Sequence, residues 1–395
     1  MIECRTIKEL CSVVVDCPHS TPTWTAEGKI VVRSNNIKNG RIDFSSPSYT
    51  DDEHFQQRIK RATPQGGDII ITREAPMGEV GMIPEGIVCC LGQRMVLLRA
   101  NPEICDNYYL LYSLQSRYVQ HQISWSEGTG TTVSNLRIPH LEQLKIPYLP
   151  LSKQRQVSSV LRCLEGKIEQ NRVINDNLER QVQAYFQELF VDNADPAWTL
   201  GTISDLGTVV GGSTPSKSKP EYYTEDGIAW ITPKDLSINK AKFISHGEND
   251  ITELGLKNSS ASIMPEGTVL FSSRAPIGYI AIASGEVTTN QGFKSVVPKP
   301  EIGTAYVYCF LKHTLPVIEG MASGSTFKEV SGSTMKNVPA VIPDTETLTC
   351  FNEFCAPIFA QQRILEEQNQ SLAALRDSLL PKLMSGELDV SGIQL

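Results

Sequence analysis

The apolar positions between Leu151 and Phe190 recur in alternating steps of three and four residues. This stretch has no proline, and its single glycine is Gly166. The repeating positions are Val157, Leu161, Leu164, Ile168, Asn171, Asn175, Leu178, Val182, Tyr185 and Leu189. A sustained period of about 3.5 predicts one long helix with a coiled-coil seam, and roughly 38 residues would extend about 57 Å. Such a helix cannot bury its own seam, so it requires a partner helix.

A diverged copy of this pattern lies near the C-terminus, from about Thr345 to Leu383. Its seam positions are Phe351, Phe354, Ile358, Gln361, Leu365, Gln368, Leu372, Leu375 and Leu379. We expect the two helices to pair antiparallel, because a whole domain separates them along the chain.

The centre of both seams is polar, with Asn171, Asn175, Gln361 and Gln368 at seam positions. Buried polar side chains at such positions fix the register of a coiled coil. The alternative is that they mark a solvated stretch or a contact with another protein. Pro357 lies inside the second pattern and removes a backbone donor, so we expect it to kink that helix or to start it anew.

The segments outside the helices are also duplicated. GDIIITREAPMG, which starts at Gly67, matches GTVLFSSRAPIG, which starts at Gly267, with an offset of 200 residues. Further matched pairs are Gly28–Ile37 with Gly227–Leu236, and Leu91–Arg99 with Gln291–Lys299. Each copy predicts short strands, and the turns at Ala75-Pro76 and Ala275-Pro276 are interpreted as structural.

The repeats give the chain the order domain, helix, domain, helix. We predict a first domain over residues 1–150, a helix segment over 151–192, a second domain over 193–343, and a helix with its tail over 344–395. The fold class is therefore α+β. Two domains of mixed strands and short helices are separated by two long antiparallel coiled-coil helices, with an internal pseudo-two-fold duplication.

Charge and composition narrow the choice of class. The net charge of −8 argues against a nucleic-acid partner, but residues 344–395 alone carry −5 and both predicted domains are near neutral. A basic face on each domain is therefore allowed. The chain has no apolar run long enough to span a membrane and no signal peptide at its start, so we expect a cytoplasmic protein. Ten cysteines without a Cys-x-x-Cys pair predict reduced thiols, and the scattered histidines predict no metal site.

Motifs for catalysis are missing from the sequence. GTGTTV at Gly128 lacks the third glycine of a dinucleotide-binding loop, and GGSTPSKS at Gly211 lacks the Gly-Lys-Ser/Thr of a phosphate-binding loop. We found no Asn-Pro-Pro-Tyr string and no local signature of a Ser/His/Asp or Cys/His set. We therefore predict no catalytic residue and no enzyme activity for this chain.

The order of the duplicated motifs resembles the specificity subunit of type I restriction–modification systems, over nearly the whole length. The segments that carry the resemblance are GGSTPSKSKPEYY and GIAWITPKDL (within Gly211–Leu236), SSRAPIGYIAIA (Ser272–Ala283), TNQGFKSVVPK (Thr289–Lys299), KIEQNRVINDNLE (Lys167–Glu179) and LLPKLMSGEL (Leu379–Leu388). The resemblance implies two target-recognition domains that bind double-stranded DNA. It also implies helices that hold two methyltransferase subunits, and a complex that includes restriction/translocase subunits. S-adenosylmethionine, ATP and Mg²⁺ would be used by those partners, and this chain would bind no cofactor.

Base edges are read by Arg, Lys, Asn, Gln, Ser and Thr side chains, and the duplicated loops are rich in them. The candidate DNA-binding residues are Thr21, Arg33, Asn35, Arg73, Arg94, Thr129, Arg137, Ser213, Thr214, Lys217, Lys234, Arg274, Asn290, Lys294 and Lys328. For any one of them, the alternative is a solvated or turn-stabilising role, and Trp230 is interpreted as a core residue. Because the two halves share few loop side chains, we predict an asymmetric, two-part DNA target. The alternative function is a protein–protein scaffold without DNA recognition.

Overall fold

The computed structural model describes residues 3–38, 40–125, 135–324, 328–388 and 390. The chain divides into two compact units. Unit 1 comprises Met1–Ile168 with Ser371–Leu395, and unit 2 comprises Glu169–Gln370. Each unit therefore contains one of the duplicated segments and a part of each long helix. Among the described residues, no helix is both long and apolar enough to cross a membrane.

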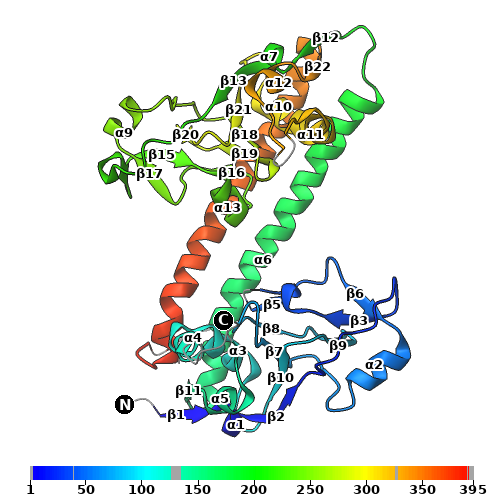
Figure 1. The fold of residues 1–395 in the computed structure, drawn as a ribbon, viewed down its shortest axis with the longest axis vertical. Helices are drawn as coiled ribbons and strands as arrows, with labels where there is room; N and C mark the ends of the chain where they lie inside the picture. Colours follow the sequence, from blue (N-terminus) through cyan, green and yellow to red (C-terminus); the bar gives the residue numbers. More distant parts are fainter. Residues whose placement is uncertain (1–2, 39, 126–134, 325–327, 389, 391–395) are drawn as a thin grey trace. The chain divides into compact units, whose positions relative to one another are not determined.

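Unit 1 is built from small sheets and short helices (Figure 1). Its strands are β1 (Cys4–Thr6), β2 (Cys11–Asp16), β3 (Lys29–Val32), β4 (Ile37–Lys38), β5 (Arg41–Ile42), β6 (Ser48–Thr50), β7 (Ile69–Thr72), β8 (Val80–Met82), β9 (Cys89–Leu91), β10 (Met95–Ala100) and β11 (Lys145–Pro147). Its helices are α1 (Ile7–Leu10), the 3-10 helix η1 (Ser34–Asn36), α2 (Asp52–Arg58), α3 (Asn107–Gln115), α4 (Arg117–Ser124) and α5 (Ile138–Gln143). The sheet orders are β2-β10-β7-β8, β6-β3-β9, β1-β11 and β4-β5.

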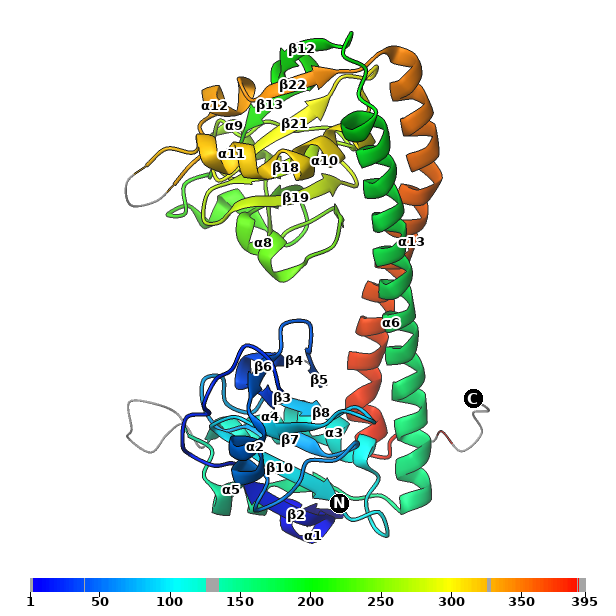
Figure 2. The same cartoon turned by 90° about the vertical axis from the view of Figure 1, so that its right-hand side faces the viewer.

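Unit 2 repeats this plan, and α10 lies against β18 and β19 (Figure 2). Its strands are β12 (Thr199–Thr202), β13 (Gly207–Gly211), β14 (Tyr223–Thr224), β15 (Ile228–Ile231), β16 (Phe243–Ile244), β17 (Asn249–Ile251), β18 (Val269–Ser273), β19 (Ile277–Ala283), β20 (Thr288–Thr289), β21 (Lys294–Pro298) and β22 (Pro339–Ile342). Its short helices are α7 (Ile203–Leu206), the 3-10 helix η4 (Pro220–Tyr222), α8 (Pro233–Ile238), α9 (Glu253–Lys257), α10 (Thr304–His313), α11 (Leu315–Met321) and α12 (Gly332–Lys336). The sheet orders are β13-β21-β18-β19-β16, β14-β17-β15-β20 and β12-β22.

The duplication read from the sequence is preserved strand by strand. The antiparallel set β2-β10-β7-β8 of unit 1 corresponds to β13-β21-β18-β19 of unit 2. The second sheet of each unit contains one parallel pair, β3 with β9 and β15 with β20. Both Ala-Pro turns, Ala75-Pro76 and Ala275-Pro276, contain a cis peptide bond. The predicted α+β class with internal duplication is confirmed.

Local sequence explains where the elements of unit 1 begin. Strand β7 is a run of β-branched residues that is buried throughout, as expected for a strand covered on both faces. Helix α1 starts at a capping box, in which Thr6 and Glu9 satisfy each other's backbone N–H groups. Helix α3 starts after Asp106, whose side chain accepts from the N–H of Tyr109. All ten cysteines are free thiols, and six are buried.

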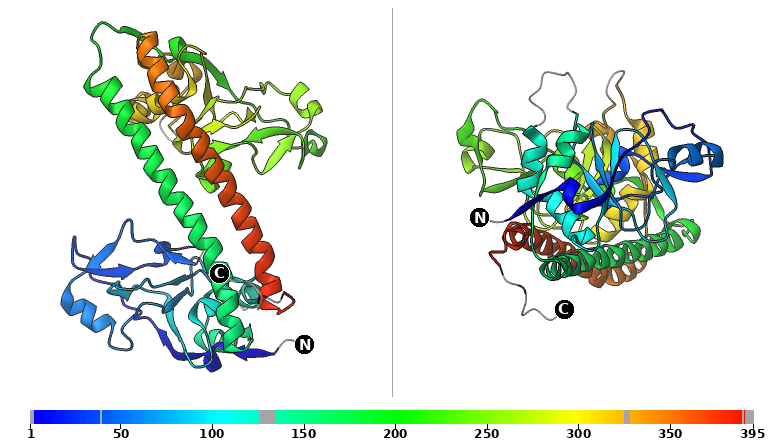
Figure 3. Two further views of the ribbon diagram at one scale, coloured as in Figure 1. Left: turned by 180° about the vertical axis from the view of Figure 1, so that it is seen from behind. Right: turned by 90° about the horizontal axis from the view of Figure 1, so that it is seen from below.

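The two long helices are α6 (Leu151–Gln187) and α13 (Thr345–Met384), and they run antiparallel within each unit (Figure 3). Helix α6 ends three residues before the predicted Phe190, because Glu188–Asp192 forms a π-helical turn. Helix α13 continues through Pro357 and does not start anew there. A proline removes a single backbone donor, which the rest of a 40-residue helix tolerates.

The polar centre of the helix pair lies in unit 2. Asn171 is fully buried, and its Nδ2 donates to Oδ1 of Asn369 at 3.0 Å and to Oε1 of Gln368 at 3.3 Å. Asn175 Nδ2 donates to the carbonyl of Gln362 at 3.3 Å, and Gln362 Nε2 donates to the carbonyl of Asn175 at 3.2 Å. These reciprocal hydrogen bonds tie the two helices together in one register.

Four predicted seam positions of α13 are exposed, namely Phe354, Gln361, Gln368 and Leu375. Phe354 still packs on Tyr185, and Gln368 accepts from Asn171. Gln361 is exposed, and the neighbouring Gln362 occupies the seam with 3% exposure. Leu375 is 46% exposed and lies outside the seam. The cause is geometric, because an α-helix has 3.6 residues per turn and drifts from a strict 3.5 repeat by about 20° per heptad.

Candidate nucleic-acid interface

Three loops of unit 2 are joined at one place by backbone hydrogen bonds. The N–H of Asn290, after β20, donates to the carbonyl of Ile231 at the end of β15, at 3.0 Å. The N–H of Ser273, at the end of β18, donates to the carbonyl of Gly292 at 2.7 Å. The carbonyl of Ser273 accepts from the N–H of Val330 at 3.0 Å. The loops that the sequence marked as polar therefore converge.

A cleft of about 480 Å³ lies among these loops. Five of the eight candidate DNA-binding residues of unit 2 line it: Thr214, Lys217, Lys234, Arg274 and Asn290. Trp230 contributes to its floor but is only 6% exposed, and its indole N–H donates to the carbonyl of Ser213 at 3.0 Å. The ring is thus held within the core, as predicted.

The charges around the cleft are partly paired. Lys234 contacts the carboxylate of Glu248, and this hydrogen bond raises the pKa of Lys234. The carboxylate of Asp235, which also lines the cleft, accepts from the N–H groups of Thr232 and Glu248. The Asp235 carboxylate therefore caps the backbone at the start of α8. The side chains of Lys217, Lys234 and Arg274 line the cleft wall.

Unit 1 joins the corresponding loops by the same hydrogen bonds. The N–H of Gly92 donates to the carbonyl of Val32 at 2.7 Å, and the N–H of Arg73 donates to the carbonyl of Arg94 at 2.8 Å. The carbonyl of Arg73 accepts from the N–H of Leu136 at 3.0 Å. Arg73 thus corresponds to Ser273, Arg94 to Gly292, and Leu136 to Val330.

Arg73 is turned into the fold and does not face outward as a DNA-binding residue would. Its side chain is 12% exposed and contacts the carboxylate of Asp16 at 2.9 Å. Its other donors reach the carbonyl of Leu136 at 2.9 Å and Oδ1 of Asn135 at 3.1 Å. A guanidinium with all three nitrogens bound is a structural clamp.

Lys294 of unit 2 is similarly turned inward. Its Nζ lies 3.3 Å from the carbonyls of Gln291 and Phe293 and 3.8 Å from the carboxylate of Glu329. Its side chain is 16% exposed, and burial lowers its pKa.

The remaining candidates lie on the surface or in the loop backbone. Arg33 is exposed, with its guanidinium 5.3 Å from the ring of Trp24. Arg94 is 58% exposed and lies 3.2 Å from the carboxylate of Glu74. The other exposed candidates are Thr21, Asn35, Arg137 and Lys328. Ser213 uses its backbone to join β20, and Thr129 lies outside the described residues.

The sequence did not single out the acidic residues of these loops. Asp16, Glu74 and Glu329 each contact an arginine from a distant part of the chain. These partners are at least 20 residues apart along the chain. A single sequence contains no periodic pattern that predicts such pairs. Within the described ranges, no cluster of His, Cys, Asp and Glu side chains could hold a metal ion.

Two copies of one α+β module, with the same loop frame and different loop side chains, define a duplicated two-module protein. The model of the family described as the type I restriction modification DNA specificity domain matches residues 3–180 and again residues 197–375. The chain therefore belongs to this family.

Individual relatives agree with this assignment. The type I restriction enzyme MjaIX specificity subunit of Methanocaldococcus jannaschii is 40% identical over 191 residues, which cover 46% of this chain and 44% of that protein. The HindI specificity subunit of Haemophilus influenzae is 28% identical over 48% of this chain and 42% of that protein. The chain thus matches less than half the length of these two relatives.

Two further comparisons extend over nearly the whole chain. The putative MjaX specificity subunit of M. jannaschii is 22% identical over 98% of this chain and 94% of that protein. The crystal structure of a type I restriction-modification system S subunit from M. genitalium has a TM-score of 0.60 at 18% identity. It covers 97% of this chain and 96% of that chain. This likeness shows the fold.

Proposed function

We propose that the chain is the DNA-specificity subunit of a type I restriction–modification complex. Units 1 and 2 each bind one part of a two-part, asymmetric DNA target, through the loops gathered beside Arg94 and Arg274. The observation that carries the proposal is the shared hydrogen-bonded loop frame with different side chains on it. One frame with two sets of polar groups is suited to reading two different sequences, because base edges are distinguished by donor and acceptor pattern.

The cleft of unit 2 favours DNA over a protein partner. Lys217, Lys234 and Arg274 line it together with the polar side chains of Thr214 and Asn290. Of the two carboxylates that also line it, Asp235 accepts backbone N–H groups and Glu248 pairs with Lys234. Cationic groups bind phosphates, and amide and hydroxyl groups read base edges. The alternative of a scaffold without DNA is favoured by the net charge of −8, but most of that charge lies in residues 344–395 and not in the two domains.

Catalysis belongs, in this proposal, to partner subunits. Two methyltransferase subunits would use S-adenosylmethionine to modify an adenine of the bound target, and restriction subunits would use ATP and Mg²⁺. The chain itself would bind no cofactor and catalyse no step. Its family membership and the absence of catalytic motifs from its sequence support this division of labour.

The test is a comparison of DNA methylation between cells that express the full system and cells from which this gene is deleted. We expect a two-part methylated motif that disappears with the gene. A continuous motif, or no change on deletion, would contradict the proposal. A second measurement is the salt dependence of DNA binding, which should be steep because phosphate contacts release counterions.

A further inference from the structure

The two units differ in charge at a pair of equivalent positions beside the Ala-Pro turns. In unit 1 these are Glu74 and Asn135, and the Nδ2 of Asn135 donates to the carboxylate of Glu74. In unit 2 the equivalent residues are Arg274 and Glu329, whose Nη1 and Oε2 lie 3.4 Å apart. The side chain next to the turn is therefore an anion in unit 1 and a cation in unit 2.

Unit 1 nevertheless places an arginine beside the same turn, from another strand connection. Arg94, between β9 and β10, occupies the place of Gly292 in unit 2 and has a φ of 62°. Its Nε lies 3.2 Å from the carboxylate of Glu74. Each unit thus presents one arginine held by one carboxylate, and the element that supplies the arginine differs between the units.

Stability alone does not account for these pairs. The side chains of Arg94 and Arg274 are 58% and 38% exposed. Ion pairs at such exposure contribute about 0–1 kcal/mol. By contrast, the inward-facing Arg73 uses all three of its nitrogens within the fold.

The chemistry of a carboxylate-held arginine fits one base in particular. The guanidinium has five N–H donors in a planar fork, so one carboxylate contact leaves donors for a further partner. The carboxylate also restricts the orientation of a long, flexible side chain. In the major groove, the O6 and N7 acceptors of guanine match this fork in a bidentate contact.

We propose that Arg94 and Arg274 are specificity-determining residues that each read a guanine, one in each part of the target. Glu74 and Glu329 are their positioning residues. The inference rests on the proposed function, since it assigns base contacts within the same interface. It predicts that both parts of the target contain a required guanine, read from differently placed arginines.

The experiment is a selection from randomised duplex DNA, with the full chain purified together with the subunits that it assembles with. Wild-type protein is compared with R274K and R94K. Lysine keeps the positive charge but lacks the planar fork. In R274K we expect preference for guanine at one base pair to fall roughly 5- to 150-fold, with the other part of the motif unchanged. R94K should do the same in the other part only.

Controls separate a base contact from a fold defect or a phosphate contact. Arg180 is an exposed arginine of helix α6 and belongs to none of these loops, so R180K should leave the motif unchanged. Thermal unfolding of each variant reports on its fold. E329Q tests positioning, and it should reduce selectivity at the same base pair as R274K, by less.

The outcomes are distinct. A wild-type protein that selects no motif would overturn the proposed function and the inference with it. A wild-type motif that persists in R274K and R94K would overturn the inference alone. A uniform loss of affinity over all sequences in R274A, with base preference intact, would identify a phosphate contact and also overturn it.

Discussion

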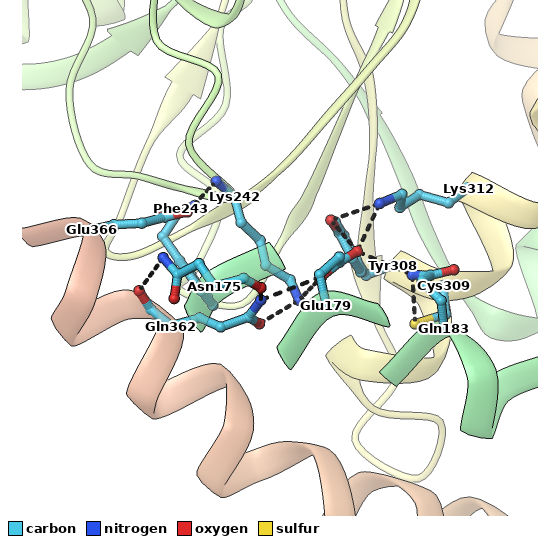
Figure 4. Close-up of polar contacts among 10 residues, drawn as sticks. All are labelled: Asn175, Glu179, Gln183, Lys242, Phe243, Tyr308, Cys309, Lys312, Gln362 and Glu366. Carbon is cyan, nitrogen blue, oxygen red and sulfur yellow. Dashed lines mark hydrogen bonds and ion pairs between the residues drawn. The ribbon is translucent and has the colours of Figure 1, made fainter. Parts of the chain in front are cut away.

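Units 1 and 2 share a backbone plan, and in each an apolar cluster packs on its part of the long helices, but the polar groups at this contact differ. In unit 1, Tyr109, Val157, Leu161 and Leu383 belong to one buried cluster, and the fully buried polar side chain on α6, that of Gln154, is uncharged. In unit 2 a buried ammonium group, that of Lys242, lies between α6 and α13 (Figure 4). The comparison teaches that the frame is fixed by backbone hydrogen bonds, while the side chains that it carries can change their chemical character.

The network around Lys242 is dense. Its Nζ lies 2.8 Å from the carboxylate of Glu179 and 2.8 Å from Oε1 of Gln362. The ring centroid of Phe359 is 3.5 Å from the same atom. The backbone N–H of Lys242 donates to Glu366 on α13 at 2.8 Å. In unit 1 the equivalent position is Gly40, because its carbonyl accepts from the N–H of Met82 as that of Lys242 accepts from the N–H of Ile282. Gly40 has no side chain to contribute.

The largest expected effect follows from removing this ammonium group. Lys242→Ala leaves the partly buried Glu179 with Lys312 as its cationic partner, so we expect a loss towards the lower end of the about 3–5 kcal/mol that breaking a buried pair costs. Urea unfolding followed by tryptophan fluorescence measures it. The matched control is Lys240→Ala, because Lys240 is exposed and its loss should change stability by less than about 0.5 kcal/mol. Equal effects in both variants would show that the buried pair does not hold unit 2 together.

The apolar contact of unit 1 provides the counterpart. Leu161 on α6 is fully buried, so Leu161→Ala should destabilise the protein by about 2–5 kcal/mol through lost burial and a cavity. Because no charge is involved, the loss should be nearly independent of pH and salt. Ser159→Ala, at an exposed position of the same helix, is the control. A loss that changed strongly with salt would contradict the apolar character of this contact.

A pH measurement distinguishes the two attachments. Burial disfavours ionisation of Glu179, but the ammonium groups of Lys242 and Lys312 outweigh it and lower its pKa to about 2, from an ordinary value of 4.5. A lowered carboxyl pKa stabilises the folded state above the unfolded value. That stability, on the order of 3 kcal/mol, is therefore lost as pH falls from 4.5 towards 2.

The variant that tests this is Glu179→Gln, which keeps an acceptor for Lys242 but cannot titrate. We expect its stability at pH 7 to be lower and its change between pH 4.5 and 2 to be smaller than in wild type. Glu188→Gln, at an exposed position near the end of the same helical segment, should retain the wild-type change. Parallel pH curves for wild type and Glu179→Gln would rule out this source of acid sensitivity.

The sequence predicted repetitive features well and long-range pairings poorly. The duplication, the two helices and the seam asparagines at positions 171 and 175 follow from local periodicity, so they could be predicted from the sequence. The inward turn of Arg73 was not, because its partner Asp16 lies 57 residues away. For the same reason, the sequence did not predict the role of Lys242, which contacts Glu179, Gln362 and Phe359.

The smallest expected change in stability concerns a hydrogen bond that both units share. Tyr109 Oη donates to the carbonyl of Pro147 at 2.9 Å in unit 1, and Tyr306 Oη donates to the carbonyl of Val341 at 2.8 Å in unit 2. These bonds join helix α3 to strand β11 and helix α10 to strand β22, so Tyr109→Phe and Tyr306→Phe should each cost about 1 kcal/mol. Denaturant unfolding of the two variants and of the double variant measures the costs and their additivity. The two costs should be equal, because the bonds have similar lengths and both tyrosines are buried. The costs should add, because the bonds lie in separate units. Clearly unequal costs would mean that the frame itself, and not only its side chains, has diverged between the two copies.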